Sequence, residues 1–323
     1  METVAELLKR LRPNLSVGQY GKIVTDTSEF MEIGYGDVIQ VGGLHYLVLR
    51  DETERSFGIE DPKYWVKRCV LLETGDRRIL KLVFHESFPL RLGKLTVKCY
   101  RSPEKESRVL ELVRGDWRFM QGITARDDHA NPVRVLEVIR GKRIDEFVAG
   151  LEVDHRTYFF EIFPGLFEKF MGACEAIAFL HEHGEKHGDI RRDHLRVESG
   201  TERFRWIDFD YTYDFYENPF GLDLFGLGSI LTFLVGMDIY HLGELERLGF
   251  SDVISSLTSE DFSLLYPNRV VNLKKIFPYI PDGLNKILLH FSQGAELGYE
   301  TVAELLRDME SARAQIVKGG NLS

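Results

Sequence analysis

Two acidic segments in the second half of the chain carry residue types whose spacing suggests chemistry. The first segment reads His187-Gly188-Asp189-Ile190-Arg191-Arg192-Asp193-His194-Leu195, and the second reads Trp206-Ile207-Asp208-Phe209-Asp210. Carboxylates of this kind can accept a proton or hold a divalent cation. The alternative is that these aspartates cap turns or pair with the neighbouring arginines, because aspartate is common in loops.

The elements that must position these segments form a strand-rich first half and a helix-rich second half. Gly42-Gly43 and Thr74-Gly75-Asp76 are turn signals between apolar runs, and Pro103 marks the start of a helix. Strands are predicted at Val38–Val41, His45–Arg50, Tyr64–Leu72, Arg78–Phe84, Phe119–Ala125, Val133–Ile139, Leu195–Glu198 and Phe204–Asp208. Helices are predicted from Pro103 and at Phe163–His183, Leu222–Met237, Asp282–Phe291 and Thr301–Ile316. This order predicts an α+β fold with a ligand site in a cleft between two lobes.

Composition limits the kinds of molecule that the protein is expected to bind and the compartment in which it is expected to work. The 323 residues carry a formal net charge of −10, which argues against sequence-independent binding to nucleic acid or to an anionic membrane. The three cysteines, Cys69, Cys99 and Cys174, form no CxxC pair, so we expect reduced, buried thiols. The first residues are too charged for a signal peptide, and no apolar run is long enough for a membrane helix. We therefore expect a cytoplasmic protein.

The two acidic segments resemble motifs of the protein kinase superfamily. The segment around Asp189 is similar to the catalytic loop H-R-D-L-K-x-x-N, and the segment around Asp208 is similar to D-F-G at the end of a strand. The resemblance implies that Asp189 is the catalytic base, that Arg191 steadies the transferred phosphate and that Asp208 is a metal ligand. It further implies a bilobal protein-kinase-like fold, with residues 44–140 as the N-lobe, 141–323 as the C-lobe and 1–43 as an extension packed on the small lobe.

Other segments resemble the parts of this family that bind ATP. Arg78-Ile79-Leu80-Lys81 is similar to the V-A-I-K strand, so Lys81 would pair the α- and β-phosphates. Glu106 would supply the partner carboxylate from the following helix, with Glu104 and Glu111 as competing choices.

The strand that leads to Gly141 resembles the hinge that bonds adenine. Leu136 would be the gatekeeper, and Glu137 and Val138 would lend backbone groups. Gly58 is the single glycine of the predicted phosphate-covering loop, where the family has three. Asp223 matches the aspartate that holds the backbone of the catalytic loop, which is a structural role.

The chain departs from the family pattern in ways that leave alternatives open. His194 replaces the metal-binding asparagine, so it either ligates a metal, for which Mn²⁺ would suit imidazole better than Mg²⁺, or hydrogen-bonds nearby. Asp210 replaces the glycine of D-F-G and is either a second metal ligand or a turn cap. Gly188 replaces the arginine that usually pairs with an activating phosphate, and no A-P-E motif lies between Asp208 and Asp223.

These observations predict an ATP-dependent phosphotransferase that uses Mg²⁺ or Mn²⁺ and acts on a serine or threonine of a protein substrate. A small-molecule kinase is the alternative that the missing peptide platform favours. A nucleotide-binding pseudokinase scaffold is the third hypothesis, motivated by His194 and by the glycine-poor loop. Oligomeric state and the identity of the acceptor stay open at this point.

Overall fold

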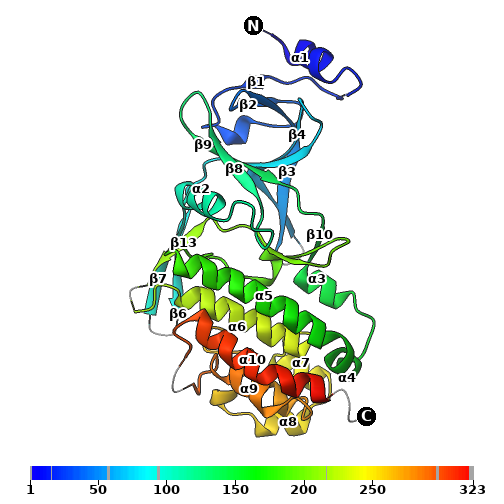
Figure 1. The fold of residues 1–323 in the computed structure, drawn as a ribbon, viewed down its shortest axis with the longest axis vertical. Coiled ribbons are helices and arrows are strands. Elements are labelled where there is room, and N and C mark those ends of the chain that lie inside the picture. The colour runs from blue at the N-terminus through cyan, green and yellow to red at the C-terminus, as the bar shows by residue number, and fades with distance from the viewer. Residues whose placement is uncertain are drawn as a thin grey trace. The chain divides into compact units, whose positions relative to one another are not determined.

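The computed structural model describes residues 2–15, 17–56, 59–92, 95–215, 217–295 and 298–319 of the chain (Figure 1). These residues form two compact units. The first unit comprises Met1–Glu86 and Arg101–Ile139, and the second comprises Ser87–Tyr100 and Arg140–Ser323. Each unit has its own sheets and helices and is described by itself.

The first unit is built on a seven-stranded sheet with the order β1-β2-β3-β4-β5-β9-β8. Every neighbouring pair is antiparallel except β1 and β2. The strands are β1 (Ile23–Val24), β2 (Val38–Val41), β3 (Leu44–Ser56), β4 (Ile59–Leu71), β5 (Arg77–Lys81), β8 (Gly122–Arg126) and β9 (Pro132–Glu137). Strand β9, the last strand of this unit in the chain, lies between β5 and β8. It is therefore next to Lys81, at the end of β5.

The turns of this sheet follow from their glycines. Gly42 and Gly43 have φ angles of 60° and 74°, which suit the two-residue turn that joins β2 to β3. The next hairpin, β3–β4, is longer than predicted, and it continues through the charged segment to the pair Ser56↔Ile59. Cross-strand ion pairs such as Asp51–Lys67 support this extension. Gly58 lies outside the described residues.

Two helices accompany the sheet of the first unit. Helix α1 (Val4–Leu11) buries Val4, Leu7 and Leu8 in a cluster with residues of β2 and β3, so this early segment is packed on the sheet. Helix α2 (Pro103–Leu112) begins where the sequence predicts. The Ser102 hydroxyl accepts from the backbone N–H of Lys105, and Pro103 occupies the first turn.

The second unit is mainly helical. Its helices are α3 (Ile144–Ala149), α4 (His155–Thr157), α5 (Phe163–Glu182), α6 (Gly221–Gly236), α7 (Leu242–Arg247), α8 (Ser251–Ser256), α9 (Asp282–Leu289) and α10 (Val302–Gly319). Helix α5 packs against α6 and α10, as the green, yellow-green and red ribbons of Figure 1 show. Helix α6 is apolar on all sides and buries most of its residues, as expected for a central helix.

Two small sheets complete the second unit. One has the order β10-β11-β12, from Gly141–Arg143, Leu195–Glu198 and Phe204–Trp206. The other has the order β13-β7-β6, from Tyr211–Asp214, Leu95–Arg101 and Ser87–Leu92. The β6–β7 hairpin was not predicted from the sequence. It shares a small core with β13, in which Val97 and Cys99 pack against Tyr213.

The α+β class predicted from the sequence is confirmed, with a strand-rich unit and a helical unit. Most predicted elements are present, with bounds that shift by a few residues. The three cysteines are buried and free of disulfides. Among the described residues, no helix combines the length and apolarity that crossing a membrane requires.

Candidate functional site

In the first unit, one buried carboxylate binds two buried cations. The Nζ atom of Lys81, at the end of β5, lies 2.8 Å from Oε1 of Glu106 on α2. The other oxygen, Oε2, lies 3.1 Å from Nε of Arg134 on β9. Arg134 also donates to the carbonyl oxygens of Pro132 and Leu82, at 2.7 and 2.9 Å. The structure therefore brings Lys81 and Glu106 together and adds Arg134, which the sequence analysis did not consider.

The structure also shows which acid of α2 is the partner of Lys81. Glu104 and Glu111 are both exposed, and Glu111 pairs with Arg114, just beyond the end of α2. Glu106 is completely buried. It is thus the acid of this helix that faces Lys81.

Glu106, Lys81 and Arg134 form a buried charged triad. Removing Lys81 and removing Arg134 should have unequal effects on stability. We expect Arg134→Met to destabilise the protein by about 2–4 kcal/mol, because two buried carbonyl groups lose their donor. Lys81→Met should cost less stability, since Glu106 keeps Arg134 as its partner. The free energy of unfolding in urea measures both changes. A Lys81→Met variant that is less stable than Arg134→Met would contradict this account of the triad.

The predicted adenine-binding residues lie at the end of β9. Leu136 is buried and packs on Gly122 of β8. The backbone N–H of Glu137 donates to the carbonyl oxygen of Gln121 at 3.0 Å. The Glu137 carboxylate accepts from the backbone N–H of the same glutamine at 2.7 Å. The N–H of Glu137 is therefore already engaged within the sheet.

In the second unit, Asp223 of α6 holds the backbone of the loop that carries Asp189. Its carboxylate accepts from the N–H groups of His187 and Gly188, at 2.7 and 2.9 Å, and contacts Nε2 of His181 at 3.0 Å. Burial alone would raise the pKa of this carboxyl. The hydrogen bond and charge of His181, the charge of His187 and the Gly188 N–H outweigh burial, and the net pKa is lowered.

Asp189 lies among charged groups of its own loop. Its Oδ1 atom is 3.4 Å from Nε of Arg191, and its Oδ2 atom is 3.4 Å from Nδ1 of His194. Burial raises the pKa of the Asp189 carboxyl. The neighbouring His194 and Arg191 oppose the shift, and the carboxylates of Asp208 and Asp193 reinforce it. A carboxylate with a raised pKa is a better proton acceptor, which suits a general base.

The hydrogen bonds of His194 identify its tautomer. Arg191 can only donate, and its Nη2 lies 3.1 Å from Nε2 of His194, so Nε2 accepts. The proton is therefore on Nδ1, which faces the carbonyl oxygen of Asp189 at 2.9 Å. Nε2 also lies 3.4 Å from Oδ2 of Asp208. Both ring nitrogens of His194 therefore have neighbours within the protein.

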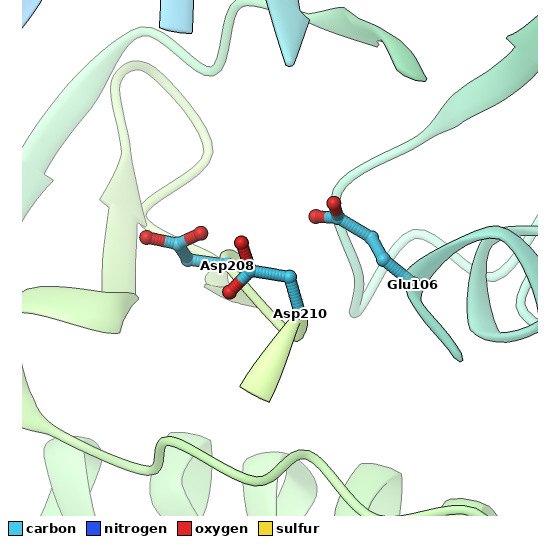
Figure 2. A group of neighbouring side chains, drawn as sticks. All are labelled: Glu106, Asp208 and Asp210. Atoms are coloured by element: carbon cyan, nitrogen blue, oxygen red, sulfur yellow. The ribbon is translucent and has the colours of Figure 1, made fainter. Parts of the chain in front are cut away.

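Asp208 and Asp210 follow β12 and belong to the same short segment (Figure 2). A carboxylate oxygen of one lies within 4.8 Å of a carboxylate oxygen of the other. Asp208 has a φ angle of 64°, a left-handed conformation that is strained for most residues but tolerated by aspartate and asparagine. Such strain is often kept where a side chain must point in one direction. Figure 2 also draws Glu106, the acid of the first unit's triad.

Gly188 explains one departure from the kinase pattern. Its φ angle is 88°, and a Cβ atom at this position would lie 1.8 Å from the carbonyl oxygen of Tyr211. Strand β13 therefore packs directly on the backbone of the Asp189 loop. No side chain can occupy position 188 unless β13 or the Asp189 loop moves. The strand is further fixed by Lys186, whose Nζ donates to the carbonyl oxygen of Tyr213 at 3.0 Å.

In the comparisons with known proteins, the similarities found are to solved structures. No family model matches the chain, and no curated protein sequence matches it. The chain is similar to the crystal structure of Rad53 1-466 in complex with AMP-PNP, with 14% sequence identity and a TM-score of 0.47. The match covers 81% of this chain and 64% of that chain, which is less than two thirds of its length.

The fold is protein-kinase-like in the order of its elements. The five strands from β3 onward, excluding the β6–β7 hairpin, are arranged as β3-β4-β5-β9-β8, with α2 between β5 and β8 in the chain. The helical unit then carries a long helix, a loop with two short strands, and a buried helix headed by Asp223. Sequence reasoning found these parts and missed Arg134 and the β6–β7 hairpin.

Proposed function

We propose that the protein is an ATP-dependent phosphotransferase, most simply a kinase for a serine or threonine hydroxyl of a protein. The observation that carries the proposal is the Asp189 loop. A carboxylate with a raised pKa is fixed there beside Arg191, His194 and Asp208, on a backbone held by Asp223. Phosphoryl transfer depends on positioning and charge, and this loop supplies both.

Each residue of the proposal has a distinct task. Asp189 would accept the proton of the acceptor hydroxyl and orient its oxygen. Arg191, whose side chain is half exposed beside Asp189, would contact the phosphate oxygens. Lys81, positioned by Glu106, would contact the phosphates of the nucleotide.

Asp208 and Asp210 are the residues that would hold a divalent cation. Their carboxylate oxygens are close together, and oxygen donors are the ligands that Mg²⁺ prefers. A bound Mg²⁺ or Mn²⁺ would neutralise charge on the phosphates. Because both ring nitrogens of His194 have neighbours within the protein, we expect no special preference for Mn²⁺.

The test is transfer of labelled phosphate from γ-labelled ATP to protein. We expect Asp189→Asn to lower the rate by at least about 10²-fold, the typical cost of losing a general base. Asn keeps the size of the side chain, so the melting temperature should change little. Asp193→Asn is a matched control, because it removes a neighbouring acid that also contacts Arg191. Wild-type rates for Asp189→Asn would refute Asp189 as the base, whereas a wild type that transfers no phosphate would leave a small-molecule kinase or a pseudokinase.

A small-molecule kinase is the second candidate, and the structure offers one observation in its favour. The segment after Asp210 forms β13, which is paired with β7 and packed on Gly188. This segment is therefore already engaged within its own unit, in the part of the chain where protein kinases carry a docking platform for peptides. ATP turnover that is stimulated by a small alcohol, without labelling of protein, would favour this candidate.

A further inference from the structure

Lys186 and Tyr213 connect the loop that carries Asp189 to strand β13. Lys186 lies just before this loop in the chain, and its side chain is half-buried. Its Nζ atom donates to the carbonyl oxygen of Tyr213 at 3.0 Å and lies 4.0 Å from the centre of the Tyr213 ring. The ring and the carbonyl oxygen together compensate the cation for the water that it loses on burial.

The loop lies along one edge of β13. Two carbonyl oxygens of the strand contact it. That of Tyr213 accepts from Lys186, and that of Tyr211 lies 1.8 Å from the place that a Cβ atom of Gly188 would occupy. Carbonyl groups two residues apart along a strand point in the same direction. Residues 186–188 therefore depend on β13 for their position.

The β6–β7 hairpin supports β13. Tyr213 is almost fully buried and packs against Val97 and Cys99 of β7. The ring of Phe88 on β6 lies 5.8 Å from the ring of Tyr211. Strand β13 has only four residues, and even a two-stranded hairpin is marginally stable in water, so β13 needs its neighbours in the sheet. The position of β13 therefore depends on the hairpin.

Tyr213 also contacts helix α6. Its hydroxyl oxygen accepts from the backbone N–H of Asp223 at 3.3 Å. The Asp223 carboxylate in turn accepts from the N–H groups of His187 and Gly188. One tyrosine is thus connected to the loop by two routes, through the side chain of Lys186 and through Asp223.

We propose that Lys186 and Tyr213 are positioning residues for phosphate transfer, and that the β6–β7 hairpin affects the rate through them. The proposal rests on the proposed function, because it concerns the same Asp189. Neither side chain takes part in the chemistry, and each fixes the backbone that carries Asp189. A displacement of about 1 Å at a reacting group can lower a rate by about 10²-fold, so contacts that fix the loop can govern turnover.

The test compares Lys186→Met with the wild type in transfer from γ-labelled ATP to a random peptide mixture that contains serine and threonine. Methionine keeps a flexible apolar chain on the Tyr213 ring but cannot donate to the carbonyl oxygen. We expect the maximal rate to fall by about 10- to 100-fold, while the KM for ATP changes by less than about twofold. Lys186→Arg should recover most of the rate, because a guanidinium also donates hydrogen bonds and stacks on aromatic rings.

Lys169→Met is the matched control. Lys169 belongs to α5 in the same unit, and its Nζ atom lies 2.9 Å from Glu202. This variant should keep the wild-type rate. A Lys186→Met variant with the wild-type maximal rate and a lower melting temperature would show a role in stability alone, and the proposal would be wrong. A change confined to the KM for ATP would also contradict it, because Lys186 would then act on nucleotide binding.

Val97→Ala tests the hairpin, and it also serves if Lys186→Met does not fold. The smaller side chain loosens the packing of Tyr213, so we expect a lower maximal rate. This loss should not add to that of Lys186→Met in the double variant, since both act through β13. Val302→Ala, at a buried valine of α10 in the same unit, should lower the melting temperature but not the rate. Equal rates for Val97→Ala and Val302→Ala would overturn the role of the hairpin.

Failure of the positioning role and failure of the kinase proposal give different results. If the wild type transfers no phosphate, amide hydrogen exchange tests the positioning role alone. The N–H groups of His187 and Gly188 should exchange about tenfold faster in Lys186→Met than in the wild type, and at the wild-type rate in Lys169→Met. Unchanged exchange in Lys186→Met would refute the role of Lys186, whether or not the protein is a kinase.

Discussion

Asp208→Asn should reduce phosphate transfer by about 10³-fold while leaving the fold intact. The change removes the carboxylate charge that would hold the divalent cation, and losses of this size are typical when one charge-stabilising group is removed. Asparagine has nearly the same shape as aspartate and also tolerates the left-handed φ of 64° at this position. A loss of phosphate transfer in Asp208→Asn would therefore be caused by the missing charge and not by backbone strain. Transfer from γ-labelled ATP, measured with Mg²⁺ and with Mn²⁺, gives the rates.

Two further variants help to interpret the transfer rate of Asp208→Asn. Asp208→Ala removes the same charge but places alanine in a left-handed conformation, which should cost about 1–2 kcal/mol of stability. Asp210→Asn tests whether the second carboxylate shares the cation, in which case more metal is needed to reach half of the maximal rate. Wild-type turnover of Asp208→Asn in both metals would refute the assignment of Asp208 as a ligand.

Gly188→Ala should destabilise the second unit by roughly 2–4 kcal/mol and impair transfer as well. The new Cβ atom would lie 1.8 Å from the carbonyl oxygen of Tyr211 and 2.6 Å from its carbonyl carbon. Both are backbone atoms of β13, so a rotamer change cannot relieve the clash. Either β13 or the Asp189 loop must move. Unfolding in urea and the transfer rate together measure the effect.

Gly184→Ala is the matched control for this prediction. Gly184 also has a positive φ angle, 75°, but no atom lies within 4 Å of a Cβ at that position. It should show only the strain of the left-handed backbone, about 1 kcal/mol. If Gly188→Ala and Gly184→Ala had the same free energy of unfolding, the close packing of β13 on Gly188 would not contribute to stability, and the prediction would be wrong.

Local signals in the sequence were enough to predict much of the fold. Paired glycines predicted the β2–β3 turn, and Pro103 predicted the start of α2, because these residues act on the backbone next to them. The Lys81–Glu106 pair and the backbone-holding role of Asp223 were expected from resemblance, and the structure places these residues accordingly.

Non-local features could not be predicted in the same way. The β6–β7 hairpin is stabilised by β13, more than a hundred residues further along the chain, and Pro89 within β6 argues against a strand. Arg134 interrupts an apolar strand, and a charged residue in such a place usually indicates an exposed position. Its ion pair with Glu106 depends on the register between β5 and β9, which places Arg134 opposite Lys81.

The β6–β7 hairpin also has consequences for how the protein is made. The chain enters the second unit at Ser87, leaves it after Tyr100 and enters it again at Arg140, so neither unit is one continuous stretch. A fragment that starts at residue 140 would lack the strand that pairs with β13, and Tyr213 would lose Val97 and Cys99 from its core. During synthesis, the hairpin leaves the ribosome well before β13 exists. Its apolar face must therefore stay unsatisfied until more than a hundred further residues have been added.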